Sequence, residues 1–88
     1  MFYDWDEEKN NLLKIKRGIG FEQIILEISN KNLLDVLENP NKDKYSHQFM
    51  YIIKSGDYVY CVPFVKEKDK IFLKTIYPSR KFKKLYEH

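Results

Sequence analysis

The chain has 88 residues, of which 43% are hydrophobic and 16% aromatic, and it carries a formal net charge of +3. A chain of this length predicts one domain, spanning residues 1–88, with one modest core that aromatic side chains help to fill. No apolar run is long enough for a membrane-spanning helix, and the acidic start does not resemble a signal peptide. The single cysteine, Cys61, excludes an internal disulfide. We therefore expect a soluble, cytoplasmic protein.

The N-terminal part predicts a short extended arm followed by a helix. Residues 2–3 form the arm, and Asp6 has the character of a helix N-cap because two acidic residues follow it and suit the positive end of a helix dipole. Gly18 is the usual left-handed residue that ends a helix. We predict a helix over 7–17, with Trp5 packing into the core just before it.

A second helix is predicted between Gly20 and Asn30, because its apolar residues recur at helical spacing. The apolar stripe consists of Phe21, Ile24, Ile25 and Ile28. The residues expected to face solvent are Glu22, Gln23 and Glu27.

The rest of the chain predicts β-segments and a closing helix. The β-segments cover residues 33–38, 49–54, 58–65 and 70–77, although a short helical turn fits 33–38 nearly as well. Residues 39–48 read as a loop, 55–57 as a tight hairpin turn, and 80–86 as a helix capped by Ser79. The predicted fold class is α+β, with two N-terminal helices, an antiparallel sheet of about four strands and a short C-terminal helix.

Alternation along the predicted strands assigns side chains to faces. Pro63 has no N–H to donate, so we predict an edge position or a bulge at this residue. In the last strand, one face is predicted to hold Ile71, Leu73, Thr75 and Tyr77. The opposite face is predicted to hold Lys70, Phe72, Lys74 and Ile76.

Positive charge is concentrated in the second half of the chain. Residues 1–48 hold seven Lys or Arg and nine Asp or Glu (7 − 9 = −2), whereas residues 49–88 hold nine and four (9 − 4 = +5). Such an asymmetry indicates an anionic partner, and cations combined with tyrosines suit RNA. The candidate RNA-binding residues are Lys54, Lys81, Lys83, Lys84 and Tyr77. A solvated basic tail, and core positions for Tyr77 and Tyr86, remain alternatives.

Candidate chemistry is limited to a reaction that needs no metal or other cofactor. The sequence has no Cys/His cluster with metal-ligand spacing, no phosphate-binding glycine loop and no nucleophile elbow. Cleavage of RNA by attack of its own 2′-hydroxyl needs a base, an acid and cations on the phosphorane. The candidate catalytic residues are Arg80 and Lys74, as cations, and His47, as acid or base, although a histidine in a loop can also be a bystander.

Three short motifs resemble the BrnT family of toxins. Residues 5–10 (WDEEKN) match its W-D-x-x-K-N opening, and residues 18–22 (GIGFE) resemble its G-V-S-F-E-E segment. Residues 79–81 (SRK) resemble its S-A-R-K segment, with Tyr86 at a familiar distance. The chain departs from the family pattern at Arg17, where a histidine is common, and at Gly20, where serine is usual.

The resemblance implies a RelE-like fold and a toxin of a type II toxin–antitoxin pair. Such a toxin cleaves mRNA, on or off the ribosome, inhibits translation, and is neutralised by a cognate antitoxin that is usually a DNA-binding repressor. The alternative is a binding module without catalysis, either a degenerate toxin that binds only its antitoxin or a small RNA-binding regulator. A purely structural partner protein is a third possibility.

Overall fold

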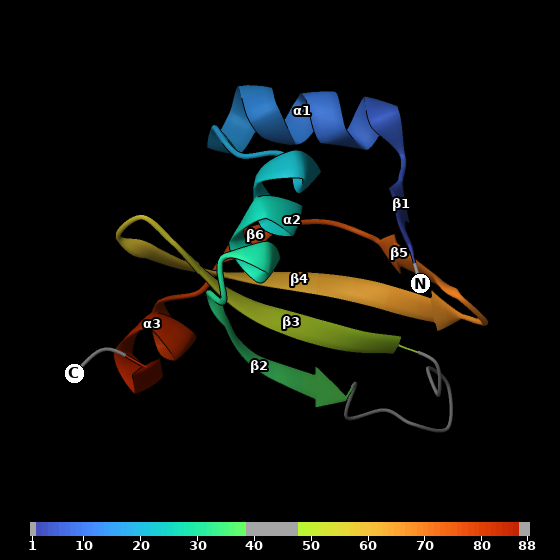
Figure 1. Ribbon diagram of the computed structural model, residues 1–88. Coiled ribbons are helices and arrows are strands. Elements are labelled where there is room, and N and C mark those ends of the chain that lie inside the picture. Colours follow the sequence, from blue (N-terminus) through green and yellow to red (C-terminus); the bar gives the residue numbers. More distant parts are fainter. Residues whose placement is uncertain (1, 39–47, 87–88) are drawn as a thin grey trace.

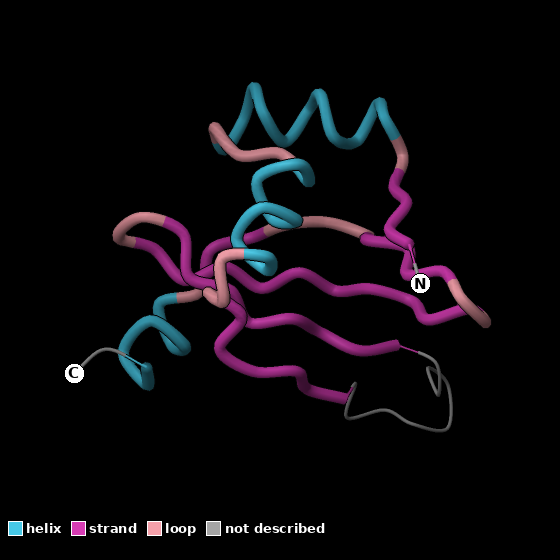
Figure 2. Tube along the Cα trace, viewed as in Figure 1, coloured by secondary structure: helices cyan, strands magenta, loops and turns pink. Residues whose placement is uncertain are grey.

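The computed structural model describes residues 2–38 and 48–86 (Figure 1). Along the chain the elements are β1 (Phe2–Trp5), α1 (Glu7–Arg17), α2 (Phe21–Ser29), β2 (Leu33–Glu38), β3 (Gln48–Ser55), β4 (Tyr58–Glu67), β5 (Lys70–Leu73), β6 (Tyr77–Pro78) and α3 (Arg80–Tyr86). Figure 2 shows the strands forming one curved sheet, with the helices outside it. Within the described ranges, no helix is long and apolar enough to cross a membrane.

Over residues 2–38 and 48–86, the sheet has six strands and mixed pairing, which corrects the predicted fold class. Its order is β1-β5-β4-β3-β2, and β6 pairs with β4. The prediction of two N-terminal helices, an antiparallel sheet of about four strands and a RelE-like arrangement is therefore wrong. The first element is a strand, and β1 runs parallel to β5. Only the broad α+β class agrees with the structure.

The N-terminal strand, β1, forms because it pairs with β5, which comes much later in the chain. Phe2 lies opposite Lys70 and Trp5 opposite Leu73, and the Phe2 N–H donates to the Asp69 carbonyl at 3.0 Å. A parallel pair needs a long crossover connection, here everything between β1 and β5. A four-residue segment carries no local signal for such a partner, so the sequence indicates only an extended arm.

The last predicted strand is broken by a one-residue register shift beside Pro63. Leu73 lies opposite Phe64, but Tyr77 lies opposite Cys61, so one extra residue is accommodated between β5 and β6. The shift moves Tyr77 to the face opposite the predicted one, because side chains alternate along a strand. Ile76, fully buried, joins the core face instead. Pro63 itself lies in an interior strand and pairs regularly with Met50, so the predicted edge position is wrong and the extra residue lies in the segment opposite Pro63. The predicted faces of Ile76 and Tyr77 are also wrong.

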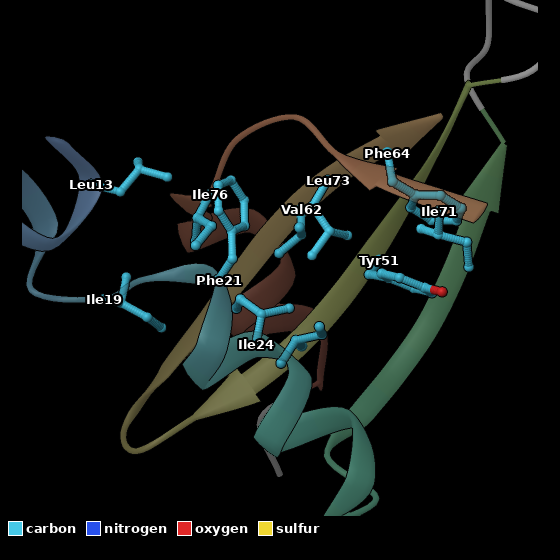
Figure 3. Packing of buried hydrophobic residues seen from close by; sticks show 11 residues of the cluster. Leu13, Ile19, Phe21, Ile24, Tyr51, Val62, Phe64, Ile71, Leu73 and Ile76 are labelled. Atoms are coloured by element: carbon cyan, nitrogen blue, oxygen red, sulfur yellow. The ribbon is translucent and has the colours of Figure 1, made fainter. Parts of the chain in front are cut away.

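Helices α1 and α2 cover one face of the sheet. Figure 3 shows Phe21 and Ile24 of α2 pointing toward Val62 and Leu73. The Trp5 ring stacks on Phe21 with centroids 5.6 Å apart, so Trp5 packs where the sequence predicts. This cluster forms the main core of the protein.

A buried asparagine joins the two helices. Asn10 is fully buried, and its Oδ1 accepts a hydrogen bond from the Phe21 N–H at 2.7 Å. Its Nδ2 donates to Glu7 and Glu22 at 3.2 and 2.9 Å. Gly20, the N-cap of α2, makes no side-chain cap bond of its own, so Asn10 supplies the missing acceptor. A Cβ on Gly20 would stand 2.8 Å from Asn10 Oδ1, which explains the glycine.

Glu27 is buried against the sheet, so the prediction that it faces solvent is wrong. Its carboxylate accepts hydrogen bonds from Asn32 at 2.8 Å and Gln23 at 3.3 Å. The Ser55 hydroxyl is the largest influence that lowers the pKa of this carboxyl below its ordinary value of 4.5, against the opposing effect of burial. These donors replace water around the carboxylate, which makes its burial tolerable.

Candidate functional site

Helix α3 covers one end of the opposite face of the sheet (Figure 1). Ser79 caps it as predicted, because the Phe82 N–H donates to Ser79 Oγ at 3.2 Å. Phe82 and Tyr86, one turn apart, pack on a small cluster of Ile52, Val59 and Cys61. The backbone enters the helix directly from the sheet, since the Ser79 N–H donates to the Val59 carbonyl at 2.9 Å. The start of α3 is therefore held at the hairpin end of β4.

A groove of about 350 Å³ lies between α3 and the β3–β4 hairpin. Its lining consists of Leu34, Lys54, Asp57, Val59, Lys83 and Tyr86. Two of these side chains are cationic, and they come from separate elements, β3 and α3. The groove thus brings the ammonium groups of two elements together with one carboxylate, one tyrosine and two aliphatic side chains.

Three further basic residues of α3 extend the positive charge beyond the groove. Lys83 contacts the Tyr58 ring, with its Nζ 5.1 Å from the ring centroid. At the helical spacing of about 100° per residue, Arg80 lies toward the same flank as Lys83, and Lys84 lies on the side of α3 away from the sheet; both are exposed. Lys81 lies on the outer side, its Nζ 5.7 Å from the Phe82 ring centroid.

These cations are not neutralised by the acidic residues that the structure describes. In residues 2–38 and 48–86, the salt bridges formed are Lys14–Glu22 at 3.0 Å and Lys70–Asp4 at 3.6 Å. Neither pair includes a residue of α3 or of the groove. Asp57 is the acidic residue of the lining, so the groove and its flank keep an excess of positive charge.

A tyrosine and an aspartate meet at the edge of the groove. The Tyr86 hydroxyl donates to Asp35 Oδ2 at 2.7 Å, joining α3 to β2. This hydrogen bond is the main cause that raises the pKa of Tyr86 above its ordinary value, because the carboxylate favours the protonated phenol. Sequence reasoning did not assign this pair, since 51 residues separate the two side chains and no local pattern connects them.

The predicted site residues do not all meet at this groove. Lys54 and Lys83 line it, and Arg80 begins the adjacent helix. Lys74 lies elsewhere on the same face: its N–H donates to the Pro63 carbonyl, whereas Lys54 lies opposite Val59. These two positions on β4 are four residues apart, or ~13 Å at ~3.3 Å per residue. His47 lies outside the described residues, so its predicted role as acid or base stays a prediction.

Tyr77 and Cys61 lie opposite each other in the sheet, Tyr77 exposed and Cys61 buried. Tyr77 is 37% exposed, and its hydroxyl donates to Met50 Sδ at 3.4 Å. Cys61 is a buried free cysteine, and burial raises the pKa of its thiol. A thiol held in its protonated form is a poor nucleophile, so Cys61 contributes packing.

The acidic opening motif is structural in this protein. Asp6 caps α1 by accepting from the Glu8 and Lys9 N–H groups at 2.9 and 3.4 Å. Glu7 accepts from the Trp5 indole at 3.1 Å. Across the part of the chain that is described, no group of three or more His, Cys, Asp or Glu residues is arranged to hold a metal ion.

Comparison with protein-family models, with curated proteins and with solved structures finds no match to this chain. The function is therefore inferred from the geometry of the site and from the sequence motifs.

Proposed function

We propose that the protein is the toxin of a type II toxin–antitoxin pair and cleaves mRNA without a metal ion. The observation that carries the proposal is the groove in which Lys54 and Lys83, from separate elements, flank the Tyr86–Asp35 pair. Two ammonium groups can bind a phosphate and stabilise the extra charge of a phosphorane. The motif resemblance to BrnT toxins supports the same class of activity.

The proposed reaction is transesterification within the RNA chain. The 2′-hydroxyl oxygen attacks the adjacent phosphorus, the bond to the 5′-oxygen breaks, and the products are a 2′,3′-cyclic phosphate and a 5′-hydroxyl. Tyr86 and Asp35 form the route by which the proton of the 2′-hydroxyl reaches a carboxylate, and His47 is the proposed acid for the leaving oxygen. Arg80 binds the neighbouring phosphate as a planar fork. The cognate antitoxin neutralises the toxin by covering this surface.

A second candidate is a binding module that does not cleave RNA. The observation that favours it is the hydrogen bond from Tyr86 to Asp35, which raises the pKa of the phenol and keeps it protonated, so that it does not act as a base at neutral pH. Under this proposal the groove binds RNA or an antitoxin, and the basic residues serve affinity alone.

Incubation of purified protein with labelled mRNA, with and without ribosomes and in the presence of EDTA, separates the two candidates. Discrete fragments ending in a cyclic phosphate support the nuclease. A salt-sensitive mobility shift with intact RNA supports the binding module.

The matched variants are Lys54→Gln with Lys83→Gln, and Lys16→Gln as the control on the exposed face of α1. The double variant is expected to cut at least tenfold more slowly, and Lys16→Gln to cut at the parental rate. In cells, Arg80→Ala is expected to relieve growth arrest while the protein stays folded. Arrest at parental strength in a folded Arg80→Ala protein contradicts the role of Arg80.

A further inference from the structure

A row of three side chains continues from the groove along the uncovered part of the α3 face. Tyr77 lies opposite Cys61, the Lys74 N–H donates to the Pro63 carbonyl, and Phe72 lies opposite Val65. Alternate residues of a strand point to the same face. The side chains of Tyr77, Lys74 and Phe72, here called the open-face row, therefore share the face on which α3 sits.

The open-face row is accessible and mixes rings with a cation. Tyr77 is 37% exposed, Lys74 is exposed and Phe72 is half-buried. Lys74 Nζ lies 5.6 Å from the centroid of the Phe72 ring. Helix α3 packs against Val59 and Cys61, so Pro63 and Val65 further along β4 stay half-buried. The shift beside Pro63 matters here, because it places Tyr77 on the same face as Phe72 and Lys74.

The row and the groove lie along the same face of β4, with α3 packed on Val59 and Cys61 where the two meet, and together they are here called the track. The groove reaches Val59, and the row follows beside Cys61, Pro63 and Val65. The six residue steps from Val59 to Val65 span ~20 Å, which accommodates roughly four nucleotides, the lower end of the site sizes of single-strand-binding grooves. Beyond Phe72 along β5, Lys70 is paired with Asp4 at 3.6 Å.

We infer that this track binds single-stranded RNA on one side of the proposed cleavage site. Bases stack on the Tyr77 and Phe72 rings, and Lys74 pairs with a phosphate between them. The track lies over β4 and β5, which are both interior strands, so an extended peptide finds a free strand edge for main-chain hydrogen bonds only at the two-residue β6. The inference rests on the proposed function, because it extends the substrate contacts of the same site.

The test is fluorescence anisotropy with labelled single-stranded RNAs of two and six nucleotides, carrying 2′-O-methyl groups so that they cannot be cleaved. The variants are Phe72→Leu, which keeps an apolar side chain, and Lys74→Gln, with Lys16→Gln as the charge control. Each row variant is expected to raise the Kd for the six-nucleotide RNA about fivefold, the lower range for loss of one base stack or phosphate contact. The Kd for the two-nucleotide RNA, and both values for Lys16→Gln, are expected to match the parent.

An abasic six-nucleotide RNA tests stacking directly. It is expected to bind the parent more weakly, and to lose less affinity on Phe72→Leu, because the ring then has fewer bases to stack on. Thermal melts check that each variant folds.

Parental binding of the six-nucleotide RNA by both folded row variants overturns the inference. The inference is also overturned if Phe72→Leu weakens the binding of an acidic peptide but leaves the binding of RNA unchanged. That result assigns the face to a protein partner. The two proposals fail separately. If the six-nucleotide RNA binds more tightly than the two-nucleotide RNA but no RNA is cleaved, the track is supported and the nuclease proposal fails. If both row variants cleave at the parental rate and RNA length has no effect on binding, the nuclease proposal is supported and the track fails.

Discussion

Replacing Asn10 with alanine removes the hydrogen bonds that hold the start of α2 against α1. The Phe21 N–H loses its acceptor at 2.7 Å in a site that is fully buried. Loss of a helix cap costs about 0.5–2 kcal/mol, and hydrogen bonds to charged groups contribute about 1.5–3 kcal/mol each. The carboxylates of Glu7 and Glu22 are exposed and regain water, which offsets part of the loss. We expect the free energy of unfolding to fall by about 3 kcal/mol.

Urea denaturation followed by circular dichroism measures this change. For a domain of this size, 3 kcal/mol corresponds to a fall in Tm of roughly 12–24 °C. Asn11→Ala is the matched control, since Asn11 is the next residue along α1 and is exposed. It is expected to change the free energy of unfolding by less than ~0.5 kcal/mol.

A second readout reports the broken contact itself. The pKa of Glu22 lies below its ordinary value of 4.5, chiefly because Asn10 donates to its carboxylate and also because of its own backbone N–H and Lys14. NMR titration is expected to show this pKa rising in Asn10→Ala and unchanged in Asn11→Ala. Equal stability of the two variants, or an unchanged Glu22 pKa in Asn10→Ala, refutes the role assigned to Asn10.

Three further predictions concern stability and reactivity. Because the pKa of Glu27 is lowered on folding, its contribution to stability is complete well above pH 4.5 and is lost as the pH falls through the folded-state pKa. Urea denaturation at several pH values should therefore show that the free energy of unfolding falls less steeply with acid in Glu27→Gln than in the parent, and an identical pH dependence contradicts this. Cys61 should react with iodoacetamide at pH 8 only as the protein unfolds, whereas labelling of the native protein at the rate of a free thiol contradicts its burial. Gly20→Ala should lower the free energy of unfolding by about 1–3 kcal/mol through overpacking against Asn10, and a melt at the parental temperature argues against that close approach.

The elements that the sequence predicts correctly are those whose causes are local. Asp6 caps α1, Gly18 ends it with φ of 71°, and Ser79 caps α3, each through contacts within a few residues. The stripe of α2 that includes Phe21 and Ile24 faces the core because helical periodicity alone assigns it. Such features need no knowledge of the rest of the chain.

The candidate site is predictable only in part. The basic composition of α3 and the position of Lys54 on a strand follow from the sequence, and both contribute to the groove. The contact between Tyr86 and Asp35 does not, because it depends on how α3 crosses the sheet to reach β2. The position of Lys74 is not predictable either, because only the strand pairing shows that it lies about 13 Å along β4 from Lys54.

The sequence by itself determined the helices, their ends and the concentration of cations in the second half of this protein, because propensity, capping and charge act over a few residues. Only the tertiary structure decided that β1 pairs with β5, that Asn10 caps a second helix, and that Tyr77 faces the same side as Phe72. Each of these depends on which distant strand or helix supplies the partner. A single extra residue in the segment beside Pro63 then moves the Tyr77 side chain to the opposite face of the sheet, since side chains in a strand repeat every two residues.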